Sequence, residues 1–594
     1  MQEGAARSDI VAGLVYSIVH NYLNRVVGNR TVGKRIVLQG GVAKNSAIPL
    51  AFAALTGKDI IVPPDPELMG CFGVALLARR KLKEGLLYPS SYSIEDVLER
   101  DIVFNGEFIC RACSNLCPVR RLKVNGHEYC FGGRCSKFSN SRTKNTEETG
   151  AIDLVKRRHE LLFDVHGAPP PKKNGARRPL VGIPQVFSVY SLWPLYSGFF
   201  NALGVDWIMP SSIDHEGLEK MNAPFCFPGE IAHGMMPELL NGGCDYYFLP
   251  HFKDYESYQD DVHACLCPIT QGLPYYLRTA FDIPQEKILA PVITFSNGLD
   301  SGAASFVEMA RQMGFTVEEG RKAFAKGIDA FRAYLADARA EGAQILEQLE
   351  RENRTAIVLF GRPYNAFTTD ANMGIPQKFI SRGYTVIPFD FIPFEDAEIY
   401  ENMYWYYGQQ NLRAAVNSAR NRNLYVCYLS NFSCAPDSFI LHYLRWIHGT
   451  KPFLVLELDS HTADAGIDTR IEALLDIIDG YRLRGGIPLE TRFMSRYEAI
   501  VEPGGLHIKD QMTGTVIDMR DRRIKFLLPN MGSEATQASA AICRRYGIDT
   551  EGLPVSDINT VQLAQNVASG KECIPCLIVL GSFIQYFERN GVDP

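Results

Sequence analysis

Short apolar runs that alternate with helical patterns constrain the fold of this chain more than any other feature. Three of them, RIVLQGGV (35–42), LVGIPQVF (180–187) and TAIVLFGRPY (355–364), have the composition of buried strands with glycine or proline nearby. Each is followed by a segment whose apolar residues recur at helical spacing. Strands that alternate with helices are typical of parallel sheets covered by helices, so the sequence predicts an α/β fold.

The chain has 594 residues, which is too many for one ordinary core. A proline-rich stretch, GAPPPKKNGARRP (167–179), has the composition of a stiff connector and predicts a domain boundary. Before it we expect an α/β part and then a small cysteine-rich ribbon with a connector. After it we expect two doubly wound α/β units of flavodoxin-like proportions, the second incomplete, joined by a helix. The expected parts are 1–85, 86–166, 180–317, 318–354 and 355–594.

Charge and apolar patterning narrow the class of protein. The chain has 61 Lys and Arg against 67 Asp and Glu, and its net charge of −6 gives no support to nucleic-acid binding through a basic surface. The first residues lack the basic and apolar regions of a secretory signal. Glycine and proline interrupt the uncharged stretch 180–205, so we expect no membrane span. A cytoplasmic protein with reduced thiols is the expectation.

Fifteen cysteines need an explanation in a chain that can bury a core without disulfides. Five lie in one short window, where Cys110-x-x-Cys113 forms a knuckle and two later thiols can complete a four-thiolate site. Zinc is favoured because the turn Gly132-Gly133 suits a second knuckle, although a small iron–sulfur cluster uses the same ligands and a chance grouping is the alternative. The candidate ligands are Cys110, Cys113, Cys117, Cys130 and Cys135.

A second set of cysteines lies in loops near strand ends or helix starts, mostly with a proline one or two residues away. Backbone N–H groups at a helix start can bond thiolates or cluster sulfides, and the loops of doubly wound domains converge at one crevice. The sequence therefore predicts that these thiols hold one iron–sulfur cluster; the alternative is that each is a buried core residue. The candidates are Cys226, Cys265, Cys267, Cys434, Cys573 and Cys576, while we expect core positions for Cys71, Cys244, Cys427 and Cys543.

Three further motifs have two interpretations each. Gly40, Gly41 and Asn45 form a strand-to-helix turn that could approach a nucleotide or could be a tight turn without a ligand. Glu230 and His233 fall on one helix turn and could relay protons, but a satisfied surface pair is the preferred interpretation. His461 lies in a polar cluster after a strand, which is either a site or a capped helix start.

With these motifs the chain resembles large fused proteins related to 2-hydroxyacyl-CoA dehydratases and their ATP-dependent activases. Residues 35–80 resemble the C-terminal half of the activase domain, which belongs to the actin, Hsp70 and sugar-kinase superfamily; there Gly40, Gly41 and Asn45 match the adenosine-side turn. The CRACSNLC…GGRC segment resembles the cysteine-rich insert of the family. Residues 180–594 resemble the dehydratase-like part through FCFPGEIAHG, CLCPIT, NFSCAPDSF, ELDSHTADAG and GKECIPC.

The resemblance implies a function. In the family an activase with a 4Fe–4S cluster hydrolyses ATP and drives a low-potential electron into a component that holds a 4Fe–4S or a double-cubane 8Fe–9S cluster. That component reduces a 2-hydroxyacyl-CoA or a small molecule. We expect this chain to be the electron-accepting component, with a separate activase as partner in a homo- or hetero-oligomer. The phosphate loops of the activase's first half are absent, so we expect a chain cut at both ends that hydrolyses no ATP alone.

A function of another class is the alternative. The chain could be a non-catalytic scaffold whose zinc ribbon docks an activase to a separate enzyme. That interpretation predicts bound zinc and a stable complex with the activase, without a low-potential cluster.

Overall fold

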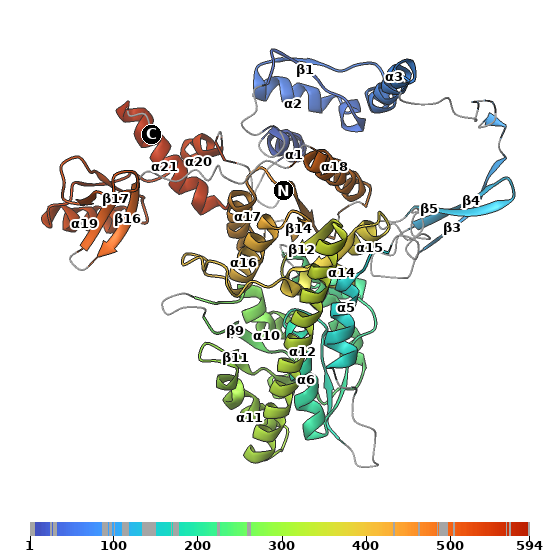
Figure 1. Cartoon of the computed structure of the whole chain (residues 1–594), viewed down its shortest axis with the longest axis vertical. Helices are drawn as coiled ribbons and strands as arrows, with labels where there is room; N and C mark the ends of the chain where they lie inside the picture. The colour runs from blue at the N-terminus through green and yellow to red at the C-terminus, as the bar shows by residue number, and fades with distance from the viewer. Residues whose placement is uncertain are drawn as a thin grey trace. The chain divides into compact units, whose positions relative to one another are not determined.

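The computed structural model divides into two compact units, a larger one of Arg100–Arg492 and a smaller one of Met1–Glu99 with Phe493–Pro594 (Figure 1). Each unit is described by itself. The residues that the structure describes are 6–23, 27, 32–85, 93, 95, 98–99, 101–109, 118–132, 150–167, 169, 178–221, 226–257, 263–431, 434–460, 462, 464–483, 485, 497–502, 505–565, 567–568 and 572–591.

Two four-stranded parallel sheets form the centre of the larger unit. The first has the order β10-β8-β6-β7 and the second the order β13-β12-β14-β15. Numbered by appearance in each sheet, both have the order 2-1-3-4, which begins the 2-1-3-4-5 order of flavodoxin-like sheets. The strands are β6 (Leu180–Gly182), β7 (Asp206–Ile208), β8 (Tyr246–Phe248), β10 (Ile288–Leu289), β12 (Ala356–Phe360), β13 (Thr385–Pro388), β14 (Leu424–Asn431) and β15 (Phe453–Leu458).

These sheets bear out the predicted α/β class, whereas the assignment to flavodoxin-like and actin-like folds stays a prediction. Strands β12 and β14 are buried along their whole length, as expected for parallel strands covered on both faces. A further parallel pair joins β9 (His251–Asp254) to β11 (Val292–Thr294). The strand predicted over 180–187 is shorter than expected. It ends at Gly182, and the chain continues from there to the helix α6 (Val189–Leu203).

Helices cover the sheets and connect their strands. They are α5 (Leu154–Glu160), η5 (Leu161–Val165), α6 (Val189–Leu203), α7 (His215–Glu219), α8 (Phe227–Gly234), α9 (Met236–Asn241), α10 (Pro268–Phe281), η6 (Gln285–Lys287), η7 (Leu299–Gly302), α11 (Ala303–Gln312), α12 (Val317–Glu352), α13 (Pro363–Ala366), α14 (Thr369–Asn372), α15 (Ile375–Ile380), η8 (Phe389–Phe391), α16 (Tyr406–Arg420), α17 (Ala435–His448) and α18 (Asp464–Leu483).

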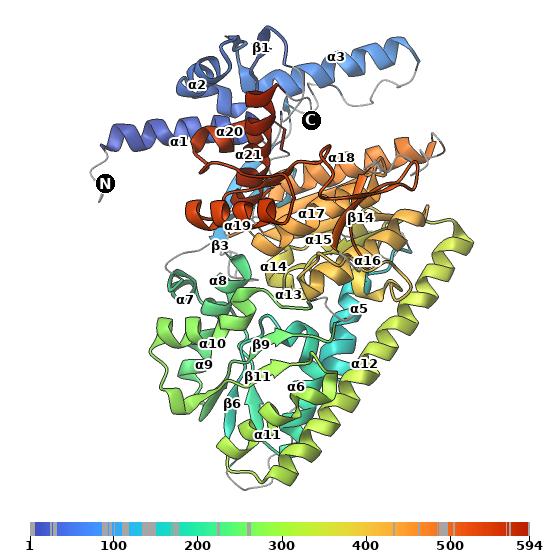
Figure 2. The ribbon, with the colours of Figure 1, turned by 90° about the vertical axis from the view of Figure 1, so that its left-hand side faces the viewer.

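The long helix α12 corresponds to the helix expected over 318–354. It begins with a capping box, in which Thr316 and Glu319 exchange side-chain and backbone hydrogen bonds. It packs against α6, beside the first sheet, and against η8, which follows β13 of the second (Figure 2). At the α6 contact a Cβ on Gly327 would lie 2.5 Å from the carbonyl oxygen of Leu195, so only glycine fits there.

The segment before the first sheet contains an antiparallel ribbon and a helical part that is buried against the core. Strands β3 (Ile102–Ile109), β4 (Pro118–Val124) and β5 (His127–Gly132) form an antiparallel ribbon. Residues 150–166 were expected to belong to a connector, but they contribute to the core. Leu154 and Val155 of α5 are buried, and the backbone N–H of Val386 in β13 donates to the carbonyl oxygen of Ile152. Local composition does not reveal this burial, since α5 is rich in charged residues.

The smaller unit has an N-terminal and a C-terminal part. In the first, β1 pairs in parallel with β2; in the second, β16, β17 and β18 are antiparallel and β19 pairs in parallel with β20. The compact units thus divide the chain differently from the expected part 355–594, because residues 493–594 form sheets of their own. The elements are α1 (Arg7–Tyr22), β1 (Arg35–Val37), η2 (Gly41–Lys44), α2 (Ala47–Thr56), β2 (Asp59–Ile61), η3 (Pro66–Leu68), α3 (Met69–Lys83), β16 (Tyr497–Glu502), β17 (Gly505–Asp510), β18 (Val516–Asp518), β19 (Phe526–Leu528), α19 (Ser533–Arg545), β20 (Thr550–Gly552), α20 (Ile558–Gln565) and α21 (Ile574–Asn590).

Among the described residues, none of the helices combines the length and the apolar character needed to cross a membrane.

The contact between α6 and α12 gives a test of the packing. We expect Gly327→Ala to lower the free energy of unfolding by about 1–3 kcal/mol, because the added methyl group overpacks the helix crossing. Gly480→Ala in α18 is the matched control, since a Cβ there meets no atom within 4 Å and alanine favours a helix by roughly 1 kcal/mol. Urea unfolding followed by circular dichroism measures both; equal behaviour of the two variants would contradict the close packing.

Candidate functional site

Three of the predicted ligand cysteines occupy the same local position. Cys226, Cys267 and Cys434 are the N-cap residues of α8, α10 and α17, and each helix has a proline in its first or second position. Proline suits this position because it donates no hydrogen bond and its backbone is preorganised for a helix. Each thiol therefore lies where the first backbone N–H groups of a helix lack partners within the helix.

In the structure these three thiols lie within electrostatic range of Arg362. Cys267 interacts electrostatically with both Cys226 and Cys434. Arg362 interacts with all three. The helices that begin at these cysteines are far apart in sequence, so the grouping results from the arrangement of the sheets.

Arg362 lies at the carboxyl end of β12, one residue after Gly361. Glycine is required at position 361, because the φ of Gly361 is 137° and a Cβ would lie 2.6 Å from the carbonyl oxygen of Leu429 in the neighbouring strand β14. In the second sheet β12 and β14 are the adjacent strands from which the chain winds in opposite directions. Ligands of open α/β sheets bind in the crevice outside such a switch point.

A buried ion pair fixes the guanidinium. Arg362 is 3 % exposed and its Nη2 donates to Asp437 Oδ2 at 3.0 Å and to Asn431 Oδ1 at 2.8 Å. Asp437 also accepts hydrogen bonds from Ser430 and Tyr428. The Nε atom of Arg362 is buried and has no hydrogen-bond partner among the described residues. One N–H donor therefore remains for a group that binds beside the thiols.

Tyr364 extends the polar network to Cys267. Its hydroxyl lies 3.2 Å from the Sγ of Cys267 and accepts a long hydrogen bond of 3.5 Å from Arg362 Nη1. Burial, and then the neighbouring Cys267, raise the pKa of Tyr364 well above its usual value. The phenol therefore stays protonated and can donate a hydrogen bond to a thiolate.

Burial also controls the protonation of the thiols. It raises the pKa of Cys226 to about 12, with a smaller contribution from Cys267, and it raises the pKa of Cys434 well above its usual value. Burial opposes the charge of Arg362, but Asp437 and the neighbouring Cys434 outweigh burial and raise its pKa. In the metal-free protein the site therefore combines a charged arginine with protonated thiols of Cys226 and Cys434 at neutral pH.

Three other predicted residues have explanations within the fold. Cys265 forms a backbone bridge with Trp405, and a hydrogen bond with the thiol of Cys265 raises the pKa of Tyr404. The preferred interpretation of Glu230 and His233 as a surface pair is wrong, because both are buried. His233 Nδ1 lies 2.8 Å from the carbonyl oxygen of Gly229, and burial lowers its pKa, so the ring is neutral.

Other cysteines vary in setting. Cys573 is the N-cap of α21, with a proline at the second position, and Cys576 is exposed in the first turn; both belong to the smaller unit. Cys244 and Cys427 are buried as expected for core residues. Cys71, however, is exposed and Cys543 is only half-buried, because the helices α3 and α19 turn these residues toward solvent.

The predicted ribbon site can be followed only at Cys130, which lies in β5 opposite Arg121 of β4. The other candidate ligands, Cys110, Cys113, Cys117 and Cys135, lie outside the described residues, as does His461.

The predicted nucleotide turn has the expected strand–turn–helix order. Gly40 has a φ of 95° and its N–H donates to Pro66 O at 2.7 Å, while the side chain of Asn45 accepts from Ala47 N at 3.1 Å. These bonds also stabilise a turn without a ligand, so both interpretations stand.

Across the described part of the chain, no three His, Cys, Asp or Glu side chains form a group that could hold a single metal ion. The three thiols around Arg362 thus do not form a closed tetrahedral site. An iron–sulfur cluster takes its thiolates on different irons and needs a wider ring of ligands. Three thiols, an unpartnered guanidinium N–H and helix starts form a donor set that fits such a group.

The polar partners of the thiols were not among the residues predicted from the sequence: Arg362, Tyr364 and Asp437. The signal for Arg362 is a charged residue directly after a five-residue apolar strand and a glycine, in AIVLFGRPY. Asp437 lies inside NFSCAPDSF, the motif that also contains the predicted ligand Cys434.

Alkylation tests the protonation of the site. A thiol with the pKa of about 12 of Cys226 has roughly a thousandfold less thiolate at pH 8 than an ordinary thiol. We therefore expect iodoacetamide to modify Cys226 of the metal-free folded chain far more slowly than the exposed Cys71, as measured by mass spectrometry of peptides. Denaturation should abolish the difference; comparable rates in the folded chain would contradict a protonated, partly buried thiol at Cys226.

Comparisons with known proteins connect the chain to activases. Residues 180–392 match a family described as a CoA enzyme activase uncharacterised domain. The chain is 39 % identical over 84 residues, or 14 % of its length and 31 % of the relative, to a 2-hydroxyisocaproyl-CoA dehydratase activator of Clostridioides difficile. It is 35 % identical over 81 residues, or 13 % of its length and 30 % of the relative, to an activator of lactoyl-CoA dehydratase of Anaerotignum propionicum.

A third match, 31 % identical over 67 residues, is to an uncharacterised protein of Methanocaldococcus jannaschii, of which it covers 28 %; in this chain it covers 11 %. The chain thus spans about a third of the length of these curated relatives. The matches support an activase-related family for this chain, while fusion with a dehydratase part stays a prediction.

Proposed function

We propose that this chain is an iron–sulfur, electron-accepting component of an ATP-driven low-potential reductase or 2-hydroxyacyl-CoA dehydratase-like system. One observation carries the proposal. Three thiols at helix starts lie within electrostatic range of a buried, charged arginine whose Nε–H has no partner among the described residues. A core cysteine needs no such cation beside it.

In this proposal Cys226, Cys267 and Cys434 hold the cluster, with Cys265, Cys573 and Cys576 as further candidates. The cluster, 4Fe–4S or 8Fe–9S, supplies a store for a low-potential electron. The residues of the chain do the rest. Arg362 donates its Nε–H toward the anionic group, and Tyr364 hydrogen-bonds the Sγ of Cys267. Fixed donors of this kind tune the potential of a cluster.

The proposed partner is an activase that hydrolyses ATP. The curated relatives are named as activators of CoA dehydratases, which supports a place for this chain in such a system. The Gly40–Gly41 turn with Asn45 would contribute to a nucleotide site only within a complete activase. A zinc or small cluster at the ribbon cysteines, and an acyl-CoA or other small molecule as substrate, belong to the same proposal.

Anaerobic reconstitution with iron and sulfide tests the ligands. We expect the full chain to bind iron and sulfide in stoichiometric amounts and to show the EPR signal of a reduced cluster. Cys267→Ala and Cys434→Ala should each lower the iron and sulfide content severalfold, because each removes a thiolate ligand.

Cys244→Ala and Cys427→Ala are the matched controls, since both thiols are buried in the same unit away from helix starts. Substoichiometric iron in the wild-type chain that Cys434→Ala leaves unchanged would reject the proposal. Bound zinc without a low-potential EPR signal would favour the scaffold instead.

The charge of Arg362 gives a second test. Reduction adds an electron, so removal of a neighbouring positive charge disfavours it. We expect Arg362→Gln to lower the midpoint potential of the reconstituted cluster by more than the ~59 mV that equals a tenfold change for one electron. Arg362→Lys, which keeps the charge, should shift the potential less.

Arg332→Gln is the control, because Arg332 is an exposed residue of α12 paired with Asp300. An EPR-monitored redox titration gives all four potentials, and a circular dichroism spectrum of each variant verifies its fold. A potential of Arg362→Gln equal to that of the wild type would show that the arginine does not face the cluster.

A further inference from the structure

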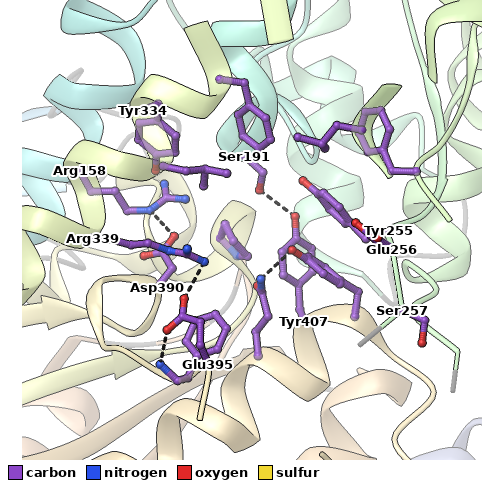
Figure 3. Close-up of a pocket in the computed structure, with 18 residues that line it drawn as sticks. Arg158, Ser191, Tyr255, Glu256, Ser257, Tyr334, Arg339, Asp390, Glu395 and Tyr407 are labelled. Carbon is purple, nitrogen blue, oxygen red and sulfur yellow. Dashed lines mark hydrogen bonds and ion pairs between the residues drawn. The ribbon is translucent and has the colours of Figure 1, made fainter. Parts of the chain in front are cut away.

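A cavity of about 340 Å³ lies within the larger unit (Figure 3). Its walls come from α6, α12, η8, α16 and the loop after β9, and they include Ser191, Tyr334, Asp390, Tyr407 and Tyr255. A volume of this size falls at the lower end of the range of about 300–1,000 Å³ for small-molecule pockets. The cavity therefore suits a small molecule.

Two polar atoms in this wall lack partners. The hydroxyl of Tyr334, a residue that is 2 % exposed, and the Oδ1 of Asp390 are buried and make no hydrogen bond within the described residues. Buried polar atoms nearly always have a partner, so these two call for a ligand or ordered water. The other oxygen of Asp390 accepts a 2.8 Å hydrogen bond from Arg158 Nε, which fixes the carboxylate (Figure 3).

Four of the five charged side chains in the cavity wall form two ion pairs, and the fifth, Glu256, is exposed. The two Nη atoms of Arg158 donate to the carbonyl oxygen of Tyr190 at 3.1 Å each, and its Nε is used by Asp390, so the guanidinium is committed to protein partners. Arg339 and Glu395 form a second pair, but both are about half exposed and are screened by solvent. A charged ligand would lose its hydration, because Arg158 and Asp390 neutralise each other and solvent screens the other, exposed charges.

Tyr407 connects the cavity to the thiols. Its hydroxyl lies 2.7 Å from Ser191 Oγ in the cavity wall, and the same side chain interacts electrostatically with Asp390 and with Cys267. Pro363, which also lines the cavity, lies in the chain between Arg362 and Tyr364. A molecule in the cavity would thus lie beside the polar network of the thiol site.

We propose that this cavity binds a small uncharged molecule that carries both a hydrogen-bond donor and an acceptor, as a carboxamide does. The ligand donates to Asp390 Oδ1 and accepts from the hydroxyl of Tyr334, and the aromatic side chains of Tyr255 and Tyr406 cover its apolar part. That this ligand is the substrate of the thiol-bound group rests on the proposed function, whereas its binding does not.

Three probes of nearly equal size test the proposal: acetamide, acetate and acetamidinium. Their binding to the metal-free full-length chain is measured by saturation-transfer NMR. We expect acetamide to bind more tightly than either ion. Tyr334→Phe removes one hydroxyl and keeps the buried ring, so it should weaken acetamide about three- to tenfold.

Tyr196→Phe is the matched control. Tyr196 is a buried tyrosine of α6 whose hydroxyl donates to Ser188 at 2.9 Å and which does not line the cavity. This variant should bind acetamide like the wild type. The absence of acetamide binding, equal binding by Tyr334→Phe, or equal or tighter binding of acetate or acetamidinium would each overturn the proposal.

The iron reconstitution separates this site from the proposed function. Tyr334-dependent binding of acetamide to a chain that takes up no cluster would retain the site and reject its role as a substrate pocket. A reconstituted cluster in a chain without acetamide binding would reject the site and leave the electron-accepting function intact.

Discussion

The buried ion pair between Arg362 and Asp437 is the interaction on which the rest of the site depends. Removing two charges from water costs several kcal/mol per ion, and only good geometry with further hydrogen bonds offsets that cost. Here Asn431, Ser430 and Tyr428 supply those bonds. All three belong to β14, so the ion pair holds the start of α17 against the end of β12.

This pair determines where a thiol can lie. Asp437 follows Cys434 by three residues, so the ion pair positions this thiol directly. Arg362 precedes Tyr364 by two residues, so the pair positions a second thiol, that of Cys267, through the phenol of Tyr364. The chain can turn from β12 into this crevice because Gly361 has a φ of 137° and has no Cβ that would collide with the carbonyl oxygen of Leu429. A Cβ at that position would displace Arg362 from the sheet edge.

Some parts of this arrangement can be predicted from local sequence and others cannot. The α/β class follows from apolar runs, and a cysteine before a proline predicts an N-cap thiol, as Cys226, Cys267 and Cys434 illustrate. Which of these thiols meet depends on the strand order, which local spacing does not contain. Cys573 has the same local pattern but belongs to the other compact unit.

Local sequence patterns likewise do not reveal which polar residues are buried. His233 and Glu230 have the spacing of a surface pair, but both faces of the short helix α8 are covered. Arg158 lies in the charged sequence LVKRRHE, yet its side chain reaches Asp390 of η8 across 232 positions of the chain. Such long-range partners come from packing, and the amphipathic period of one helix cannot identify them.

The electrostatics of the site favour a bound group that brings its own positive charge. Among the described residues the site has one fixed cation, Arg362, and Asp437 already neutralises it. Burial keeps Cys226 and Cys434 protonated in the metal-free chain, so deprotonation of several thiols would leave uncompensated negative charge in a poorly solvated crevice. In the proposed cluster, iron ions would compensate that charge, and their binding would release the thiol protons. The orphan Nε–H of Arg362 and the helix starts are directed donors, which stabilise residual negative charge on a group without adding a second full cation.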